Sequence, residues 1–439
     1  MPGLSVLLAA LALMVALLVA GVWIAVAVGV SGAVALYTLL GDRILTLFAL
    51  TSWDTTTSVV LMAVPLFVFM GEIVSSSGIV KRLYSGLSQT LDGLPGGLVQ
   101  TNLIACTIFA ACSGSSLATA ATMGRVAYPE QVGRRGYDPR LVLGSVAAGG
   151  TLGILIPPSI FFIVYGSLAD QSVGKLFLAG FFPGLMMSAL FIVYVGVRCL
   201  IQHDLVPHER IARANPGAGH WGARLRGLGQ IWPFVLLIVA VLGSIYGGVA
   251  TPTEAAGVGA AASILIALSY RALTWQGFKD ACLGTVRTTS MIFLILIAAR
   301  VMTVALAYYG VPNLMKEFAR SFGSPILLLV IISFVYLILG TIFEDFSLMI
   351  ILLPFVLPAI QAGGYDPIWF GVYMCILLEA GLLSPPVGLN LFVIQGVTGA
   401  SLGQVVWGSL PFLALLLSGA AILVAYPPLA LWLPTVWLG

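Results

Sequence analysis

Long apolar segments separated by short polar connections run through the whole chain. A helix needs about 20 mostly apolar residues to cross a membrane, and ten segments meet that length. Because such segments recur to the end, we interpret the run after Met1 as a mature span rather than a removed signal peptide. The predicted spans are residues 4–20, 22–40, 57–77, 141–168, 176–200, 231–249, 253–270, 288–309, 368–397 and 405–426.

Two further apolar segments, residues 94–130 and 324–358, have a polar centre that contains glycine. Polar groups without partners at the middle of a membrane are costly, so neither segment suits a full span. A hairpin that enters and leaves on one side, with its tip at mid-depth, accommodates both. Segments 79–92 and 311–322 are predicted to be amphipathic interfacial helices beside the hairpins. The polar centres are Ser113-Gly114-Ser115-Ser116 in the first segment, and Gly340-Thr341 with Glu344-Asp345 in the second.

The chain also contains a repeat. Gly136-Tyr137-Asp138-Pro139 recurs as Gly364-Tyr365-Asp366-Pro367, and a Pro-Pro pair follows 21 residues later in each copy, at 157–158 and 385–386. The offset is 228 residues (136 to 364), and Gly153 and Gly381 share it. Each Pro-Pro pair interrupts an apolar segment. Two helices broken at corresponding places in two halves are typical of secondary transporters. The predicted fold is therefore an all-α integral membrane protein: an inverted repeat with about ten transmembrane helices, two re-entrant hairpins and two broken helices.

Composition and charge agree with this interpretation. Hydrophobic residues make up 60% of the chain and charged residues 8%, with a mean hydropathy of +1.09, which excludes an ordinary soluble enzyme. The topology places 14 of the 19 Lys and Arg on one side, which the positive-inside rule makes cytoplasmic. Both termini then lie outside, loop 201–230 is cytoplasmic, and the two hairpins open to opposite sides. The net charge of +3 gives no reason to expect a nucleic-acid partner.

The broken helices are the first candidate site. A Pro removes an N–H and leaves carbonyls without helical partners, and nearby glycines let the backbone unwind. Oxygen atoms freed in this way suit a hard monovalent cation, and the half-helix N-termini suit an anionic substrate. A structural kink is the alternative explanation of one break; two breaks in register favour a site. The candidates here are Gly150, Thr151, Gly153, Ile156, Pro157, Pro158, Ser159, Gly381, Ser384, Pro385, Pro386, Gly388 and Asn390.

The hairpin tips are the second candidate site. Small hydroxyl residues at the first tip are equally explained by close helix packing. Carboxylates at the second tip indicate a function, because ionisable residues at membrane depth are costly. A sodium ligand, a proton site and a helix cap remain open for these acids. The candidates are Ser113, Gly114, Ser115, Ser116 and Thr119 at the first tip, and Gly340, Thr341, Glu344, Asp345 and Ser347 at the second.

Three further charges fall inside predicted spans: Glu72, Arg300 and Glu379. We expect an ion pair among them ahead of a ligand role, with Arg300 as the candidate contact for a carboxylate substrate. Glu254 is expected to mark a helix start capped by Thr251, which needs no functional explanation.

Several long motifs resemble one known family. Residues 124–130 read Gly-Arg-Val-Ala-Tyr-Pro-Glu, residues 147–159 read Ala-Ala-Gly-Gly-Thr-Leu-Gly-Ile-Leu-Ile-Pro-Pro-Ser, and residues 243–256 run from Gly-Ser-Ile-Tyr to Thr-Pro-Thr-Glu-Ala-Ala. Together with Pro385-Pro386-Val387-Gly388-Leu389-Asn390-Leu391-Phe392, they resemble the large membrane subunit of TRAP transporters, the DctM-like proteins. The resemblance covers nearly the whole chain. One departure is Ser384 where Thr is expected, and it keeps a hydroxyl.

The resemblance implies sodium-coupled import of organic acids across a bacterial or archaeal inner membrane, by an elevator-like motion. It implies a small four-helix (DctQ-like) membrane subunit and a periplasmic (DctP-like) binding protein as separate partners, with sodium as the coupling ion and no cofactor. The implied division gives the scaffold residues 1–93 and 231–323, and the transport domain residues 94–200 and 324–426. Residues 201–230 are the connecting loop and 427–439 a periplasmic tail.

Other functions explain less of the chain. No GxxxxGK[ST] sequence occurs, so hydrolysis of ATP by this chain is not expected. An intramembrane hydrolase using Ser113 or Ser115 lacks a nearby His or Lys base. A passive channel does not need paired half-helices. A stand-alone carrier of the same superfamily, working without a binding protein, remains the alternative.

Overall fold

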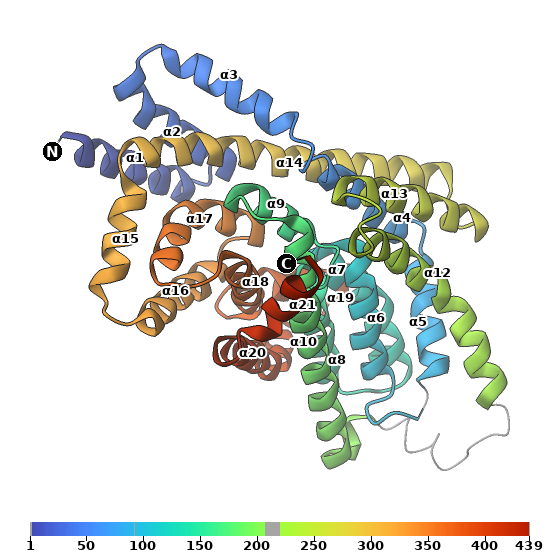
Figure 1. Cartoon of the computed structure of the whole chain (residues 1–439). Coiled ribbons are helices and arrows are strands. Elements are labelled where there is room, and N and C mark those ends of the chain that lie inside the picture. Colours follow the sequence, from blue (N-terminus) through green and yellow to red (C-terminus); the bar gives the residue numbers. More distant parts are fainter. Residues whose placement is uncertain (1, 92, 207–219, 439) are drawn as a thin grey trace.

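The computed structural model describes residues 2–91, 93–206 and 220–438, and this part of the chain is helical without a β-strand (Figure 1). The first five helices precede the first hairpin. They are α1 (Pro2–Val19), α2 (Ile24–Leu40), α3 (Arg43–Thr56), α4 (Ala63–Ser76) and α5 (Ile79–Thr90).

The expected hairpin and broken helix of the first half are both present. Helices α6 and α7 form the hairpin, and α8 and α9 form the broken helix, with a bend of 42° between them. The bounds are α6 (Leu98–Ser113), α7 (Ser116–Tyr128), the π-helix η1 (Pro129–Arg134), α8 (Pro139–Leu155), α9 (Ile160–Ala169), α10 (Val173–Ile201) and the 3₁₀ turn η2 (His203–Leu205).

The second half repeats this order. Helices α16 and α17 form its hairpin, and α18 and α19 its broken helix. The bounds are α12 (His220–Tyr246), α13 (Pro252–Ser269), α14 (Trp275–Tyr308), α15 (Val311–Ser321), α16 (Pro325–Gly340), α17 (Asp345–Ala362), α18 (Pro367–Leu383), α19 (Leu389–Thr398), α20 (Leu402–Ala425) and α21 (Pro428–Leu438).

The repeated tetrapeptide is a helix start signal. Gly136 and Gly364 have positive φ angles of 68° and 81°, which glycine adopts without strain. The Asp138 side chain accepts a hydrogen bond from the Leu141 amide, and Asp366 accepts from Ile368 and Trp369. The following Pro occupies the first helical position, where its missing N–H costs nothing. The two copies therefore begin the two broken helices in the same way.

Four expectations need correction or stay open. Helix α3 occupies residues where only a connection was expected, and residues 428–438 form α21 rather than a simple tail. The end of loop 201–230 is the first part of α12, while residues 207–219 lie outside the described residues. Within the described part, six helices can cross a membrane by length and composition, or up to eight if each bent pair is one span. The total of ten spans stays a prediction.

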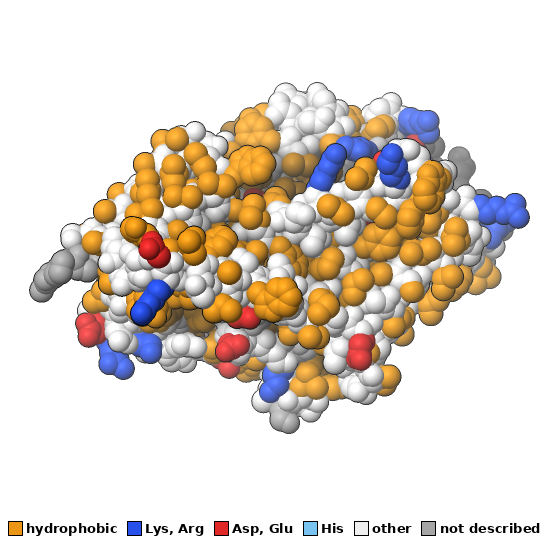
Figure 2. Space-filling view, turned by 90° about the horizontal axis from the view of Figure 1, so that it is seen from above, with side chains coloured by type: hydrophobic (Ala, Val, Ile, Leu, Met, Phe, Trp, Pro, Cys, Tyr) orange, Lys and Arg blue, Asp and Glu red, His pale blue; other side chains and the backbone are white. Residues whose placement is uncertain are grey.

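The outer surface matches a protein that faces lipid. Figure 2 shows a face on which hydrophobic side chains are widespread and charged side chains are few and scattered. Large apolar residues on α2, α3 and α14 are exposed, including Val30, Phe48 and Leu294. Exposed apolar surface on this scale marks a membrane or partner contact. This chain is accordingly a multi-pass membrane protein.

Candidate functional site

The first hairpin turns at a short, hydrogen-bonded tip. Gly114 ends α6 with a φ of 59°, and Ser115 is extended, so that its side chain caps α7 by accepting from the Ala118 amide. The hydroxyl of Thr119 donates to the Ser115 carbonyl at 2.8 Å and lies 2.7 Å from the Ser113 hydroxyl. The tip is thus a compact group of oxygen atoms with little exposure of Ser113 and Thr119.

This tip lies against the broken helix of its own half. A Cβ added at Gly153 of α8 would stand 2.6 Å from the Ser115 carbonyl oxygen and 2.8 Å from the Ser116 nitrogen. A Cβ at Gly150 would stand 2.7 Å from Cβ of Ala120 on α7. Glycine at these positions therefore allows a backbone-to-backbone approach that a larger residue prevents.

The second half repeats the contact. A Cβ added at Gly381 of α18 would lie 2.7 Å from Cα of Gly340, the last residue of α16. The Gly388 amide, at the start of α19, donates to the Thr341 carbonyl at 2.9 Å. Gly153 and Gly381 are related by the sequence offset of 228 residues, and both contact the tip of their own hairpin.

The two junctions bring different helix ends together. At the first, the C-terminal end of α8 meets the start of α7 at Ser115 and Ser116; at the second, the C-terminal end of α18 meets the C-terminal end of α16 at Gly340. Helix C-termini carry partial negative charge and carbonyls without helical partners, which favour a cation. The second halves, α9 and α19, present N-termini that favour an anion.

The predicted break residues differ in exposure. Both Pro-Pro peptide bonds are cis. Residues 151–160 are all buried, whereas Pro385 and Pro386 are exposed. The hydroxyls of Thr151 and Ser384 donate to the carbonyls of Ala148 and Ala380 in the preceding turn. The Ser159 hydroxyl, at the start of α9, donates across the break to the Ile154 carbonyl of α8. Because these hydroxyl protons are donated to backbone carbonyls, only the oxygen lone pairs remain available to a ligand.

The acids of the second tip have different surroundings. Glu344 caps α17, because its carboxylate accepts from the Ser347 amide and hydroxyl, both at 3.3 Å. Asp345 is buried, and its Oδ1 has no hydrogen-bond partner. The amide group of Asn390 on α19 is fully buried and also without partners. Unsatisfied buried polar atoms of this kind need an explanation, and a bound ion or water supplies one.

The expected ion pair among the intramembrane charges is wrong. Among described residues, ion pairs join Glu130 with Arg134 and Arg135 only. Arg300 instead donates to the Ser167 hydroxyl on α9 at 3.1 Å. Glu379 is fully buried in α18 and accepts a hydrogen bond from Ser116 of the first hairpin.

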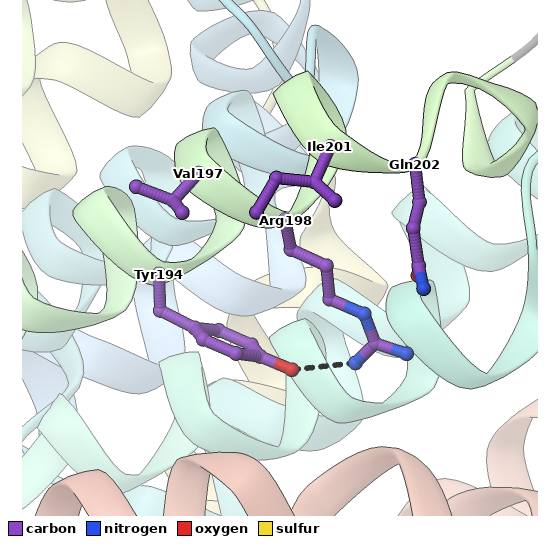
Figure 3. Close-up of a pocket in the computed structure, with 5 residues that line it drawn as sticks. All are labelled: Tyr194, Val197, Arg198, Ile201 and Gln202. Carbon is purple, nitrogen blue, oxygen red and sulfur yellow. Dashed lines mark hydrogen bonds between the residues drawn. The ribbon is translucent and has the colours of Figure 1, made fainter.

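Glu72 lines a cavity of about 100 Å³ between α4, α14 and the first tip. The cavity walls include Gly71, Ser113, Ser115 and Thr288. This cavity brings the Glu72 carboxylate of α4 next to the hydroxyls of the tip. Another groove, at the C-terminal end of α10, involves none of the predicted site residues; there Arg198 donates to the Tyr194 hydroxyl (Figure 3).

Sequence reasoning placed the tips and breaks but missed the link between Ser116 and Glu379. The signal was present as a Glu in the middle of an apolar segment, four residues before the break begins at Leu383. Its partner comes from the other half of the chain, and nothing in the local sequence identifies it.

The fold and these junctions define an α-helical membrane protein with two hairpins and two broken helices that meet in corresponding pairs. The chain belongs to a transporter family: residues 11–429 match the family described as "Tripartite ATP-independent periplasmic transporter, DctM component". It is 35% identical to the C4-dicarboxylate TRAP transporter large permease protein DctM of Pseudomonas aeruginosa, over 94% of each chain.

A second relative indicates the range of the family. The sialic acid TRAP transporter large permease protein SiaM of Vibrio cholerae is 30% identical, over 86% of this chain and 87% of that one. Among solved structures, the YdaH transporter of Alcanivorax borkumensis has a TM-score of 0.59 at 16% identity, covering 91% of this chain and 90% of the other. That likeness concerns the fold. The relatives are transporter permeases and not enzymes.

Proposed function

We propose that this chain is the translocating subunit of a sodium-coupled importer of an organic acid in a bacterial or archaeal inner membrane. The proposal rests on the two contacts between a hairpin tip and a broken helix. At these contacts the absence of a side chain at Gly153 and Gly381 allows the hairpin backbone to approach closely. The first junction brings the Ser115 carbonyl to the end of α8, and the second gathers the carbonyl ends of α16 and α18. The second half adds the unpartnered oxygens of Asp345 and Asn390. A sodium ion takes several oxygen ligands, and these oxygens are the available ones.

The substrate is proposed to be a carboxylate. The relatives named above carry C4-dicarboxylates and sialic acid according to their names. The N-termini of α9 and α19, at the two breaks, supply N–H groups for an anion. Arg300, held by Ser167 near the end of α9, is the candidate cationic contact from the scaffold.

The family name describes one component of a tripartite transporter. We propose a small four-helix membrane subunit and a periplasmic binding protein as the other two. Exposed apolar side chains on α2, α3 and α14 offer surface for lipid and for a membrane subunit.

The proposed motion moves residues 94–200 and 324–426 as one domain against a scaffold of residues 1–93 and 231–323. Within the scaffold, α2 packs on α14 and α4 on α13; within the moving domain, α8 packs on α6, α7 and α20. Gly71 of α4 lies where these two groups touch, since a Cβ there would stand 3.1 Å from Cα of Ser113. The first tip would slide past this point.

Sodium binding can be tested before the substrate is known. The melting temperature of the purified chain in detergent is measured while sodium replaces potassium or choline at constant ionic strength. A saturable, sodium-specific rise is expected, because a ligand that binds the folded state alone stabilises it. Equal curves for the three cations contradict the sodium sites.

Dependence on partners is tested separately. Vesicles that contain the chain with its small subunit are supplied with an organic acid with and without the binding protein. Uptake that requires both the binding protein and a sodium gradient is expected. Uptake without the binding protein would instead support the stand-alone carrier.

A further inference from the structure

The C-terminal end of α10 carries a row of polar side chains next to exposed apolar ones. Tyr194, Arg198 and Gln202 are spaced four residues apart, so they lie on one face of the helix. Figure 3 shows these three side chains extending in the same direction from α10. Val197 and Ile201 are beside them, with 50% and 74% of their surface exposed. The five residues line an open groove of about 340 Å³, which therefore offers polar and apolar surface side by side.

Arg198 is held in place, but its charge is not neutralised. Its Nη1 donates to the Tyr194 hydroxyl, and its Cζ lies 5.8 Å from the centre of the Tyr194 ring. That ring packs edge-on against Phe412 of α20, with 5.2 Å between the ring centres. No acidic side chain of the described residues forms an ion pair with Arg198. Because the hydrogen bond to Tyr194 uses Nη1 alone, Nε and Nη2 remain available to another acceptor.

The groove lies at the level expected for lipid headgroups. Helix α10 has 29 residues and is one of the helices that can cross a membrane. At a rise of about 1.5 Å per residue, its length of about 43 Å exceeds the hydrocarbon core of about 30 Å. Its last turns therefore reach the membrane interface, where Tyr is enriched and Arg side chains extend to the headgroups. We predict above that this end of α10 is cytoplasmic.

A phospholipid headgroup matches both kinds of surface. Arginine binds phosphate through two parallel N–H donors, and the free Nε and Nη2 edge of Arg198 can do so. The amide of Gln202, exposed at the end of the polar row, can donate to another headgroup oxygen. Val197 and Ile201 supply apolar surface for the first carbons of the acyl chains. The nearest acid along the chain, Asp204, is exposed in an adjoining recess and does not pair with Arg198, so a negatively charged lipid would balance the arginine.

We propose that the groove at the end of α10 binds the phosphate headgroup of one anionic phospholipid from the surrounding membrane. Arg198 contacts the phosphate, and Tyr194 positions the guanidinium group. The apolar side chains beside them contact the acyl chains. The groove contains none of the candidate sodium or substrate residues. The proposal therefore goes beyond the proposed function and requires only that the chain spans a membrane.

The test measures the melting temperature of the delipidated full chain in detergent and sodium-free buffer at constant ionic strength. Phosphatidylglycerol, phosphatidylcholine and inorganic phosphate are titrated in separate experiments. We expect a saturable rise with phosphatidylglycerol alone, because a ligand that binds only the folded state stabilises it. Equal curves for the two lipids would show non-specific contact with lipid and overturn the proposal. A rise that inorganic phosphate reproduces would assign the groove to a soluble anion and also overturn it.

Variants locate the lipid at the groove. Arg198→Gln should raise the half-saturating amount of phosphatidylglycerol by about tenfold, because it removes a charge-assisted contact with phosphate. The matched control is Arg226→Gln, at an exposed Arg on α12, which should leave the half-saturating amount unchanged. Tyr194→Phe keeps the ring against Phe412, so it preserves the packing and should weaken binding by a smaller factor. An unchanged half-saturating amount in both Arg198→Gln and Tyr194→Phe would refute the site, whatever the response of the chain to sodium.

Discussion

At the scale of single residues, two glycines decide how the hairpins meet the broken helices. Gly153 and Gly381 have no special φ angle; what they supply is the absence of a Cβ at a contact between two backbones. The hydroxyls of the first tip form a closed network, whereas Asp345 and Asn390 leave atoms without partners. Residues of the first kind hold the geometry, and residues of the second kind are available to a ligand.

Alanine at Gly153 or Gly381 should lower stability. The new Cβ would lie within 2.7 Å of tip backbone that cannot move alone, and such overpacking costs about 1–3 kcal/mol. The higher helix propensity of alanine offsets only up to about 1 kcal/mol of this cost. The melting temperature in detergent measures the net effect. The control is Gly257→Ala on α13, where no atom lies within 4 Å of an added Cβ. The melting temperature of this variant should not fall. A melting temperature unchanged in both junction variants would show that the tips are not held at these glycines.

Leucine at Asn390 should separate a ligand role from a structural one. The amide makes no hydrogen bond in this structure, so replacing it by an apolar group of similar size removes an unsatisfied group that costs about 1–3 kcal/mol. Stability without sodium should therefore be equal or higher, while the sodium-induced rise in melting temperature is reduced. Asn313→Leu on α15, at an exposed position, should leave the rise intact. Full sodium stabilisation in Asn390→Leu would exclude the amide as a ligand.

The residue types of the site could be predicted, but their individual roles could not. Small hydroxyls and acids inside apolar segments identify the tips from sequence alone, because polar groups are costly there. Whether an acid caps a helix or stays unpartnered depends on one turn of backbone: Glu344 bonds Ser347, and its neighbour Asp345 points into the core. The expectation that Glu72, Arg300 and Glu379 form an ion pair was wrong, because the charges in a sequence do not show which of them lie close together in the fold.

At the scale of elements, sequence patterns identified the interrupted helices well and the polar connections poorly. Pro-Pro pairs and repeated cap signals located α8–α9 and α18–α19. Helix α3 was missed because its apolar content is modest and its own second half, residues 51–56, is mostly polar, so it resembles a connection. The start of α12 was assigned to a loop for a similar reason: Arg and Gly residues dominate its first turns.

A larger side chain on α4 should hinder the motion proposed for the first hairpin. In Gly71→Val, the added atoms would press on the backbone of Cys112 and Ser113, which lies 3.1–3.2 Å from a Cβ at that position. We expect slower substrate uptake in reconstituted vesicles with an unchanged sodium effect on melting temperature. Gly257→Val is the matched control, since open space surrounds Gly257. Wild-type uptake by Gly71→Val would mean that α4 and the first tip do not slide past each other.

At the scale of the whole molecule, the repeat predicts that the two halves face opposite sides of the membrane. Gly78 and Gly310, with φ angles of 70° and 72°, begin α5 and α15, the helices that precede the two hairpins. In Figure 1 these two helices lie far apart, at opposite ends of the molecule. The excess of Lys and Arg on the α5 side predicts that this side is cytoplasmic.

This orientation can be measured by labelling single cysteines in intact cells with a reagent that does not cross the membrane. Gln276, at the start of α14, and Ser321, at the end of α15, are both exposed and are predicted to lie on opposite sides. We expect Ser321→Cys to react from outside and Gln276→Cys to react only after permeabilisation. Four native cysteines are buried and Cys282 is partly exposed, so the measurement uses a Cys282→Ala background. Labelling of both positions from outside would place both helix ends on one side of the membrane. That result would refute the inverted orientation of the two halves, on which the proposed alternating exposure of the two junctions depends.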